Sequence, residues 1–382
     1  MATKVDYGSE EEAMQLYLIE GEARAWALGN RGPIRFTDDG QLHPEIVAAY
    51  ERCGFYIFEG VVSAGELAEL EAEFLEMVER LPSEPGSKVD RLGRPALGHD
   101  RDVPVTAWSK PLGDPLTGTS AANNRHVVKM FEPTPAPGTP AQIPFVVASP
   151  MQYSEAALRL YGHPHLLRVA AAVNGEDFVP FNEVIIMKKP GEGSIFSWHQ
   201  DGTTHWDSPD WDQGCHGFNF MAQLYGSTPA NAVWYVPGSH AVGKVDLGAL
   251  VAEAGSERLP QAVPMITRPG DVCISNRQVI HGSFANTSPD WRVTFNIGFH
   301  RRRSVLGQTG YVHDTNEPIC FDAERIRKRS EVIGYAIDAR RQHFAEETPF
   351  VYQPHAAAGE SYRWNATAWD KIRAYNKLDI VI

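Results

Sequence analysis

The stretch FSWHQDGTTHWD, residues 196–207, brings together two histidines and two aspartates, which are residue types that bind metal ions. His199 and Asp201 are two positions apart in this stretch. In an extended strand, residues two apart point to the same side, so an imidazole and a carboxylate would project next to each other. A His-x-Asp triplet also occurs by chance in many chains. The prediction of a metal site therefore depends on further ligands elsewhere in the sequence.

A third ligand and a cation come from the segment HGSFANTSPDWRVTFNIGFH, residues 281–300. His281 precedes the turn-forming residues NTSPD, and WRVTFNIGF reads as the following strand. In that strand apolar residues alternate with Arg292 and other polar or small residues, which places Arg292 on the polar face. In a narrow barrel this face can be the inside. The hairpin thus brings an imidazole and a guanidinium toward the same cavity.

Together, His199, Asp201 and His281 would form a triad of two histidines and one carboxylate. This set suits non-haem Fe(II), because the opposite face of the octahedron stays open. Arg292 could then hold the far carboxylate of a 2-oxo diacid through two parallel hydrogen bonds. The alternatives are ordinary structural roles, with hydrogen-bonded histidines and a salt bridge at Arg292.

The composition is that of a soluble globular protein, with 382 residues of which 43% are hydrophobic and 22% charged. The net charge of −13, without a strongly basic block, disfavours nucleic acid as a partner. No stretch approaches the roughly twenty apolar residues of a membrane span. Four widely spaced cysteines suggest neither a disulfide scaffold nor a thiolate zinc site, so we expect a cytoplasmic protein. The oligomeric state is not indicated.

The elements that must position these residues are mostly strands. Between residues 178 and 300, short β-rich runs alternate with Gly/Pro turns, which indicates an antiparallel sandwich or barrel. Ser63 and Glu66 form a capping-box signature ahead of an amphipathic helix over 64–80. Further elements are predicted as a strand at 126–132, a helix at 151–173 broken near 162–164, and a helix at 322–344.

We predict a single catalytic domain over residues 1–382, mainly β with flanking helices. Its expected parts are an N-terminal leader with the first helix and strand at 1–62, an amphipathic helix plus a lid loop at 63–125, a jelly-roll core at 126–300, and a C-terminal helical extension at 301–382. Long loops are commonly functional lids, and a disordered surface insertion is the alternative for this one.

The sequence resembles the phytanoyl-CoA dioxygenase family of Fe(II)/2-oxoglutarate oxygenases. The matching segments are WHQD at 198–201, ANAVWYVPGSH at 230–240, RPGDVCI at 268–274 and HGSFANTSPDWR at 281–292. The eleven-residue step from His281 to Arg292 is also similar to the spacing in the family. The resemblance covers residues 127–300 and implies a double-stranded β-helix, the jelly roll of cupins.

The resemblance implies that His199, Asp201 and His281 bind Fe(II), and that Arg292 and Ser283 bind the co-substrate 2-oxoglutarate. It implies no catalytic residue beyond these metal ligands. The expected reaction is hydroxylation or a related oxidation of a small-molecule substrate, which consumes O₂ and releases succinate and CO₂. Halogenating relatives replace the carboxylate ligand with a small residue, so the presence of Asp201 favours oxidation.

Five further residues are weaker candidates. Lys129 and Gln200 match family positions near the co-substrate, and Trp198, His205 and Trp206 are candidates for substrate contact. For the tryptophans, core packing is the alternative. Two other functions also remain open, namely a non-catalytic cupin-type protein that binds a metal and a ligand, and a metal-dependent hydrolase or isomerase with the same triad.

Overall fold

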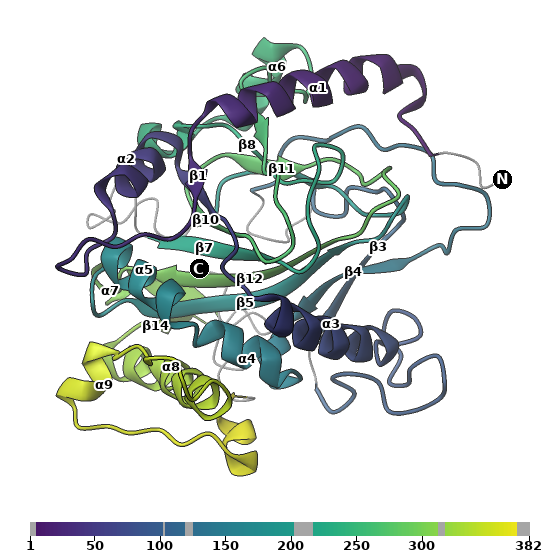
Figure 1. Cartoon of the computed structure of the whole chain (residues 1–382). Coiled ribbons are helices and arrows are strands. Elements are labelled where there is room, and N and C mark those ends of the chain that lie inside the picture. Colours follow the sequence, from purple (N-terminus) through teal and green to yellow (C-terminus); the bar gives the residue numbers. More distant parts are fainter. Residues whose placement is uncertain (1–4, 102–103, 119–124, 202–216, 312–317, 373–382) are drawn as a thin grey trace.

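Two β-sheets form the centre of the computed structural model of the chain (Figure 1). It describes residues 5–101, 104–118, 125–201, 217–311 and 318–372. The large sheet has the strand order β1 (Arg31–Gly32), β2 (Phe55–Phe58), β10 (Val272–Asn276), β7 (Gly217–Gln223), β12 (Arg292–His300), β5 (Val179–Lys188), β4 (Ile143–Ala148) and β3 (Thr106–Ser109). The small sheet has the order β6 (Phe196–His199), β11 (His281–Ser283), β8 (Trp234–Tyr235) and β9 (Val263–Pro264).

The two sheets face each other. Phe55 of the large sheet stacks on Tyr235 of the small sheet, with ring centroids 4.4 Å apart. The Tyr235 hydroxyl also donates to the sulfur of Met221 in β7 at 3.1 Å. Two packed sheets with antiparallel long strands form the predicted double-stranded β-helix, so the predicted fold is confirmed.

The outer face of the large sheet is covered by helices α3 (Ala64–Glu79), α4 (Glu155–Tyr161), α5 (Pro164–Asn174) and α8 (Ala323–His343), which Figure 1 shows on one side of β5 and β12. The apolar half of β12, Val293, Phe295, Ile297 and Phe299, belongs to the same buried cluster as apolar residues of these helices. Since side chains alternate along a strand, Arg292 points to the opposite, inner face, where it is buried.

Helices α1 (Glu11–Ala27) and α6 (Leu247–Ala254) lie over the small sheet (Figure 1). Tyr17 of α1 stacks on Trp234 of β8 with ring centroids 4.4 Å apart. The remaining elements are the helices α2 (Pro44–Cys53), α7 (Arg302–Val305) and α9 (Gln353–Ala357), and the hairpin of β13 (Thr309–Tyr311) and β14 (Pro318–Cys320). Among the described residues, none of the helices combines the length and apolar character that crossing a bilayer requires.

Several predicted elements are present where the sequence indicated them. Helix α3 begins after Ser63 with both bonds of the capping box, from Glu66 N–H to Ser63 Oγ at 3.3 Å and from Ser63 N–H to Glu66 Oε2 at 3.2 Å. The predicted break near 162–164 separates α4 from α5, and α8 occupies most of 322–344. At Gly162 the break also allows α8 to approach closely, because an added Cβ would lie 2.3 Å from the Ala336 carbonyl oxygen.

Replacing Gly162 with alanine is therefore expected to lower the free energy of unfolding by about 1–3 kcal/mol, since a backbone atom must move to make room. The measurement is chemical denaturation monitored by circular dichroism. Gly65→Ala is the matched control, because the nearest described atom to its added Cβ is Ser63 Oγ at 4.0 Å, and alanine favours a helix. Equal stabilities of the two variants would contradict the expected clash.

Two sequence predictions need correction. Residues 126–132 form no strand. Their alternating burial is present, but the Val128 carbonyl accepts from Thr117 Oγ1 and the Met130 N–H donates to the Asp114 carboxylate, so side chains satisfy backbone groups that a neighbouring strand would otherwise pair. The large sheet instead takes β3 from the predicted lid loop, of which residues 102–103 and 119–124 lie outside the described part.

The second correction concerns the predicted leader. Its polar part contains the 17-residue helix α1 and the short strand β1, which were not predicted, whereas the helix and strand expected within 1–62 are present as α2 and β2. The buried stripe of α1 consists of Met14, Tyr17, Gly21 and Ala25. Half of this stripe is glycine and alanine, so the apolar periodicity of the helix is weak in the sequence.

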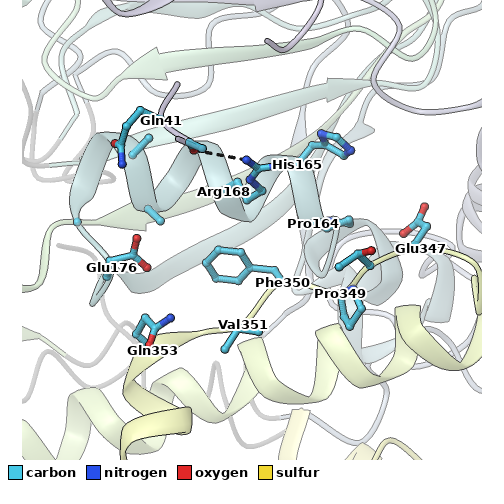
Figure 2. Close-up of a pocket in the computed structure, with 15 residues that line it drawn as sticks. Gln41, Pro164, His165, Arg168, Glu176, Glu347, Pro349, Phe350, Val351 and Gln353 are labelled. Carbon is cyan, nitrogen blue, oxygen red and sulfur yellow. Dashed lines mark hydrogen bonds between the residues drawn. The ribbon is translucent and has the colours of Figure 1, made fainter. Parts of the chain in front are cut away.

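A groove of about 840 Å³ lies between α5 and the segment before α9 (Figure 2). Two of its charged side chains, Arg168 and Glu347, have partners within the protein. Arg168 donates to the Gly40 carbonyl at 3.4 Å and lies 3.8 Å from the centroid of the Phe36 ring, and the Glu347 carboxylate accepts two hydrogen bonds from Arg340. The groove lies on the helical side of the large sheet, and no residue of the predicted triad lines it.

Candidate metal centre

His199 and His281 meet because two short strands pair in register. His199 is the last residue of β6 and His281 the first of β11, and the two are direct partners in this antiparallel pair. Asp201 lies just beyond β6 in a bend, where its backbone N–H donates to the Arg277 carbonyl at 2.8 Å. The predicted proximity of His199 and Asp201 is thus produced by a turn and not by a continuous strand.

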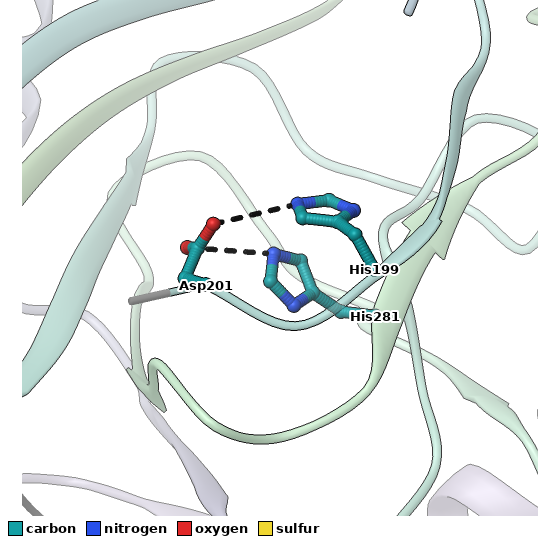
Figure 3. A group of neighbouring side chains, drawn as sticks. All are labelled: His199, Asp201 and His281. Atoms are coloured by element: carbon teal, nitrogen blue, oxygen red, sulfur yellow. Dashed lines mark ion pairs between the residues drawn. The ribbon is translucent and has the colours of Figure 1, made fainter. Parts of the chain in front are cut away.

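The donor atoms of the triad converge (Figure 3). One ligand atom from each of His199, Asp201 and His281 lies within 4.8 Å of the others. His199 Nε2 is 3.6 Å from Asp201 Oδ1, and His281 Nε2 is 3.8 Å from Asp201 Oδ2. All three residues are buried. The three predicted ligands, far apart in sequence, are therefore brought to one point between the two sheets.

Both imidazoles are held in the same tautomer. His199 Nδ1 lies 2.8 Å from the Ser197 carbonyl oxygen, and His281 Nδ1 lies 2.9 Å from the Val279 carbonyl oxygen. A carbonyl oxygen only accepts, so each Nδ1 carries the proton and each Nε2 presents a lone pair toward Asp201. A second-layer hydrogen bond of this kind orients the histidines of metal sites.

The local electrostatics favours the protonation states that a metal requires. Burial lowers the pKa of both histidines, and each also feels neighbouring positive charge, so both imidazoles are neutral near neutral pH. Burial acts to raise the pKa of Asp201, but the neighbouring basic groups, the Arg125 guanidinium above all, outweigh it and hold that pKa well below its usual range. Neutral imidazoles and an ionised carboxylate are the forms that bind a cation.

Three residues that the sequence did not single out surround the triad. Arg125 Nη2 lies 3.2 Å from Asp201 Oδ1, and Asn219 Nδ2 donates to Asp201 Oδ2 at 3.2 Å. The ring of His126 packs on that of His199, with centroids 4.2 Å apart. Asn219 could have been noticed in the sequence, because it is a polar residue between two phenylalanines that lie in the core as part of β7. The positions of Arg125 and His126 follow only from the tertiary structure.

Arg292 and Ser283 present buried polar atoms without partners. Both side chains are 1% exposed. Arg292 Nε and Nη1 and Ser283 Oγ have no hydrogen-bond partner among the described residues. Ser283 lies two residues after His281 in β11, so the two side chains point to the same side of that strand. Since buried polar groups are nearly always satisfied, these atoms are candidates for binding a ligand.

Lys129 and Gln200, the weaker co-substrate candidates, make contacts of another kind. The Lys129 side chain is 56% exposed and its ammonium pairs with Glu132 at 2.6 Å, because the segment around it turns this side chain to the surface. Gln200 points away from its two ligand neighbours. Its amide donates to the carbonyls of Gly243 and Gln278 and accepts from the Val245 N–H. Its polar atoms therefore connect separate segments of the backbone.

The substrate candidates are placed as follows. Trp198 is fully buried in the cluster between the small sheet and α1, where its indole N–H donates to the Glu257 carbonyl at 2.7 Å. Its place in this cluster puts it on the side of β6 away from His199. The structure thus gives Trp198 a packing role. His205 and Trp206 lie outside the described residues.

Three solved structures are similar to this chain. EctD from S. alaskensis, solved with 2-oxoglutarate and 5-hydroxyectoine, is 19% identical over 72% of this chain and 82% of its own, with a TM-score of 0.47. SnoN, a non-heme alpha ketoglutarate dependent epimerase from nogalamycin biosynthesis, is 18% identical over 67% of this chain and 79% of its own, with a TM-score of 0.44. HygX from Streptomyces hygroscopicus, with nickel and 2-oxoglutarate bound, is 16% identical over 68% of this chain and 87% of its own, with a TM-score of 0.44.

No curated protein matches the sequence. A family model described as "Phytanoyl-CoA dioxygenase (PhyH)" matches residues 50–294. This range is more than half of the chain and contains the three residues of the triad together with Ser283 and Arg292.

Proposed function

The chain belongs to the phytanoyl-CoA dioxygenase family, and from this premise we propose that it is an Fe(II)- and 2-oxoglutarate-dependent oxygenase of a small molecule. The observation that carries the proposal is the buried convergence of His199, Asp201 and His281 within 4.8 Å of one another. The sequence resemblance predicted these ligands and the family match covers all of them.

The donor set fits a ferrous ion. Two neutral imidazoles and one carboxylate supply a single negative charge, and this combination is typical of non-haem Fe(II) sites that keep open positions for substrates. The Asn219 amide and the Ser197 and Val279 carbonyls fix the directions of the three donors. The site is thus prepared for a metal before one binds.

The unpartnered groups of Arg292 and Ser283 fit the distal carboxylate of 2-oxoglutarate. Burial lowers the pKa of Arg292 to about 10, so the guanidinium remains charged near neutral pH. A carboxylate accepts two parallel hydrogen bonds from a guanidinium and another from a serine hydroxyl. Binding this acid would supply hydrogen-bond partners to the Arg292 guanidinium and to Ser283 Oγ and neutralise a buried charge.

When bound, the iron supplies the oxidative chemistry, in which 2-oxoglutarate and O₂ are converted to succinate and CO₂ as the substrate is oxidised. The protein's own part is to keep Asp201 ionised, to present both Nε2 atoms and to hold the co-substrate by its distal end. Burial of the triad between the sheets also limits the access of water. Because Asp201 occupies the carboxylate position, we propose hydroxylation or a related oxidation as the outcome.

The test uses purified, iron-loaded protein. We expect 2-oxoglutarate added without air to change the visible absorbance of the iron, and succinate to form under air only when both iron and 2-oxoglutarate are present. A screen of small metabolites that follows 2-oxoglutarate-dependent O₂ uptake then identifies the substrate. Protein that binds iron but neither binds nor consumes 2-oxoglutarate would refute the proposal.

The same assay separates the two alternatives. A non-catalytic metal-binding protein would bind its ligand and release no succinate with any metabolite. A hydrolase or isomerase would convert its substrate at the same rate with and without 2-oxoglutarate.

A further inference from the structure

A second buried basic side chain lies beside Arg292. Lys188 is the last residue of β5, and it is the direct partner of Arg292 in the antiparallel pairing of β5 with β12. Directly opposite residues in such a pair project from the same face of the sheet, so both side chains point inward. Lys188 is 0% exposed and Arg292 is 1% exposed.

The Lys188 side chain reaches across the interior to the small sheet. Its ammonium donates to the carbonyl of Phe284, the residue that follows Ser283 at the end of β11. The ammonium thus bonds to the chain one residue after Ser283, whose Oγ has no partner among the described residues. Groups from β5, β11 and β12 therefore gather at one end of the interior.

The charges at this end are not balanced. Among the described residues, neither Lys188 nor Arg292 forms an ion pair with a carboxylate. Like charges directly opposite each other in a sheet are destabilising, and an isolated buried charge is costly. Burial and the charge of Arg292 hold the pKa of Lys188 well below its usual value, so its charged form needs a nearby negative charge. A bound anion would remove this penalty for both cations.

We propose that Lys188 is a second cationic partner of the distal carboxylate of the 2-oxo acid, and that it sets the preference for a diacid over a mono-acid. The inference rests on the proposed function and adds a binding residue to that site. A mono-acid would leave two neighbouring buried cations unpaired, whereas a diacid supplies the missing negative charge between them.

The experiment compares two 2-oxo acids of equal chain length, 2-oxoglutarate and 2-oxopentanoate, which has a methyl group in place of the distal carboxylate. Dissociation constants are measured without air on the Fe(II)-loaded protein by absorbance and calorimetry. Lys188→Met is expected to raise the dissociation constant of 2-oxoglutarate by about 10- to 100-fold, the usual range for a hydrogen bond to a charged group. The dissociation constant of 2-oxopentanoate should stay unchanged or fall. Turnover is not needed for this readout.

Lys189→Met is the matched control. Lys189 is the next residue in the chain, but its side chain is 46% exposed and pairs with Glu192 at 2.7 Å. We expect both dissociation constants to stay as in the unmodified protein. Lys188→Gln is a second test variant, and it replaces the methionine variant if that one does not fold. Its amide can donate a hydrogen bond to the Phe284 carbonyl but has no charge. It should also lose discrimination between the two acids.

The Lys188 variants could fold and keep the discrimination of the unmodified protein, or they could weaken the binding of both acids equally. In either case Lys188 has only a structural role, in which it connects β5 to the chain after β11, and the inference fails. Failure of the unmodified protein to bind 2-oxoglutarate at all is a different result, because it rejects the proposed function itself.

Discussion

Replacement of Asp201 by alanine is expected to remove iron binding at micromolar metal and, with it, all 2-oxoglutarate turnover. The two remaining imidazoles are neutral, so the site loses its anionic donor and its charge attraction for the cation. Changes in the groups around metal ligands already cost about 10–100-fold in affinity, and the loss of a ligand should exceed this range. Calorimetric titration with Fe(II) in the absence of air measures the effect.

Asn219→Ala gives a graded comparison for Asp201→Ala. It keeps all three ligands and removes only the hydrogen bond of 3.2 Å to Asp201 Oδ2, so we expect a loss of iron affinity within about 10–100-fold. Thermal unfolding shows whether each variant keeps the fold. Iron binding by a folded Asp201→Ala protein with unchanged affinity would show that the metal is held by other groups.

The second large effect is expected for Arg292→Met, which should raise the dissociation constant of 2-oxoglutarate by about 100- to 1000-fold while iron still binds. The variant loses both hydrogen bonds of the guanidinium fork, and truncating one partner of a buried charge pair costs several kcal/mol. Arg292→Lys should restore only part of the affinity, because an ammonium cannot form the parallel pair of bonds. The measurement is the 2-oxoglutarate titration of the iron-loaded protein.

Arg168→Met is the control, because it removes an arginine that lies away from the candidate site. Arg168 lies in the groove of Figure 2, on the helical side of the large sheet, where its guanidinium bonds the Gly40 carbonyl. Its replacement should leave 2-oxoglutarate affinity unchanged. If Arg292→Met bound 2-oxoglutarate as tightly as the unmodified protein, the co-substrate would have to be held elsewhere.

Much of the local structure could be predicted because it depends on residues close together in the chain. The capping box of Ser63 and Glu66 starts α3 through bonds within one turn. Gly54 ends α2 with a φ of 81°, a conformation that glycine adopts without strain. In β12 the alternation of apolar and polar residues determined which face meets the helices and which carries Arg292. The types and order of the three ligands also follow from the sequence and its family resemblance.

Residues 126–132 show where local pattern is insufficient. Their alternation is the same as that of a strand, and the buried and exposed positions follow it. A strand also needs a neighbour with free backbone groups, and here the side chains of Thr117 and Asp114 take that role. Whether an extended segment joins a sheet is therefore decided by what packs beside it.

The two lysines make the same point for the candidate site. Lys129 and Lys188 both follow short apolar runs, and only Lys129 was singled out, by the family resemblance. The pairing of β5 with β12 places Lys188 opposite Arg292, whereas Lys129 turns outward to Glu132. Similarly, Arg125 and Asn219 reach Asp201 from separate parts of the chain.

The sequence by itself thus determined the residue types, the secondary-structure periods and which three residues are the candidate metal ligands, because these depend on chemistry and on spacing along the chain. Only the tertiary structure decided which buried polar groups meet. That outcome depends on the register between strands distant in sequence, such as His199 with His281 and Lys188 with Arg292, and a shift of one residue would turn each side chain to the other face.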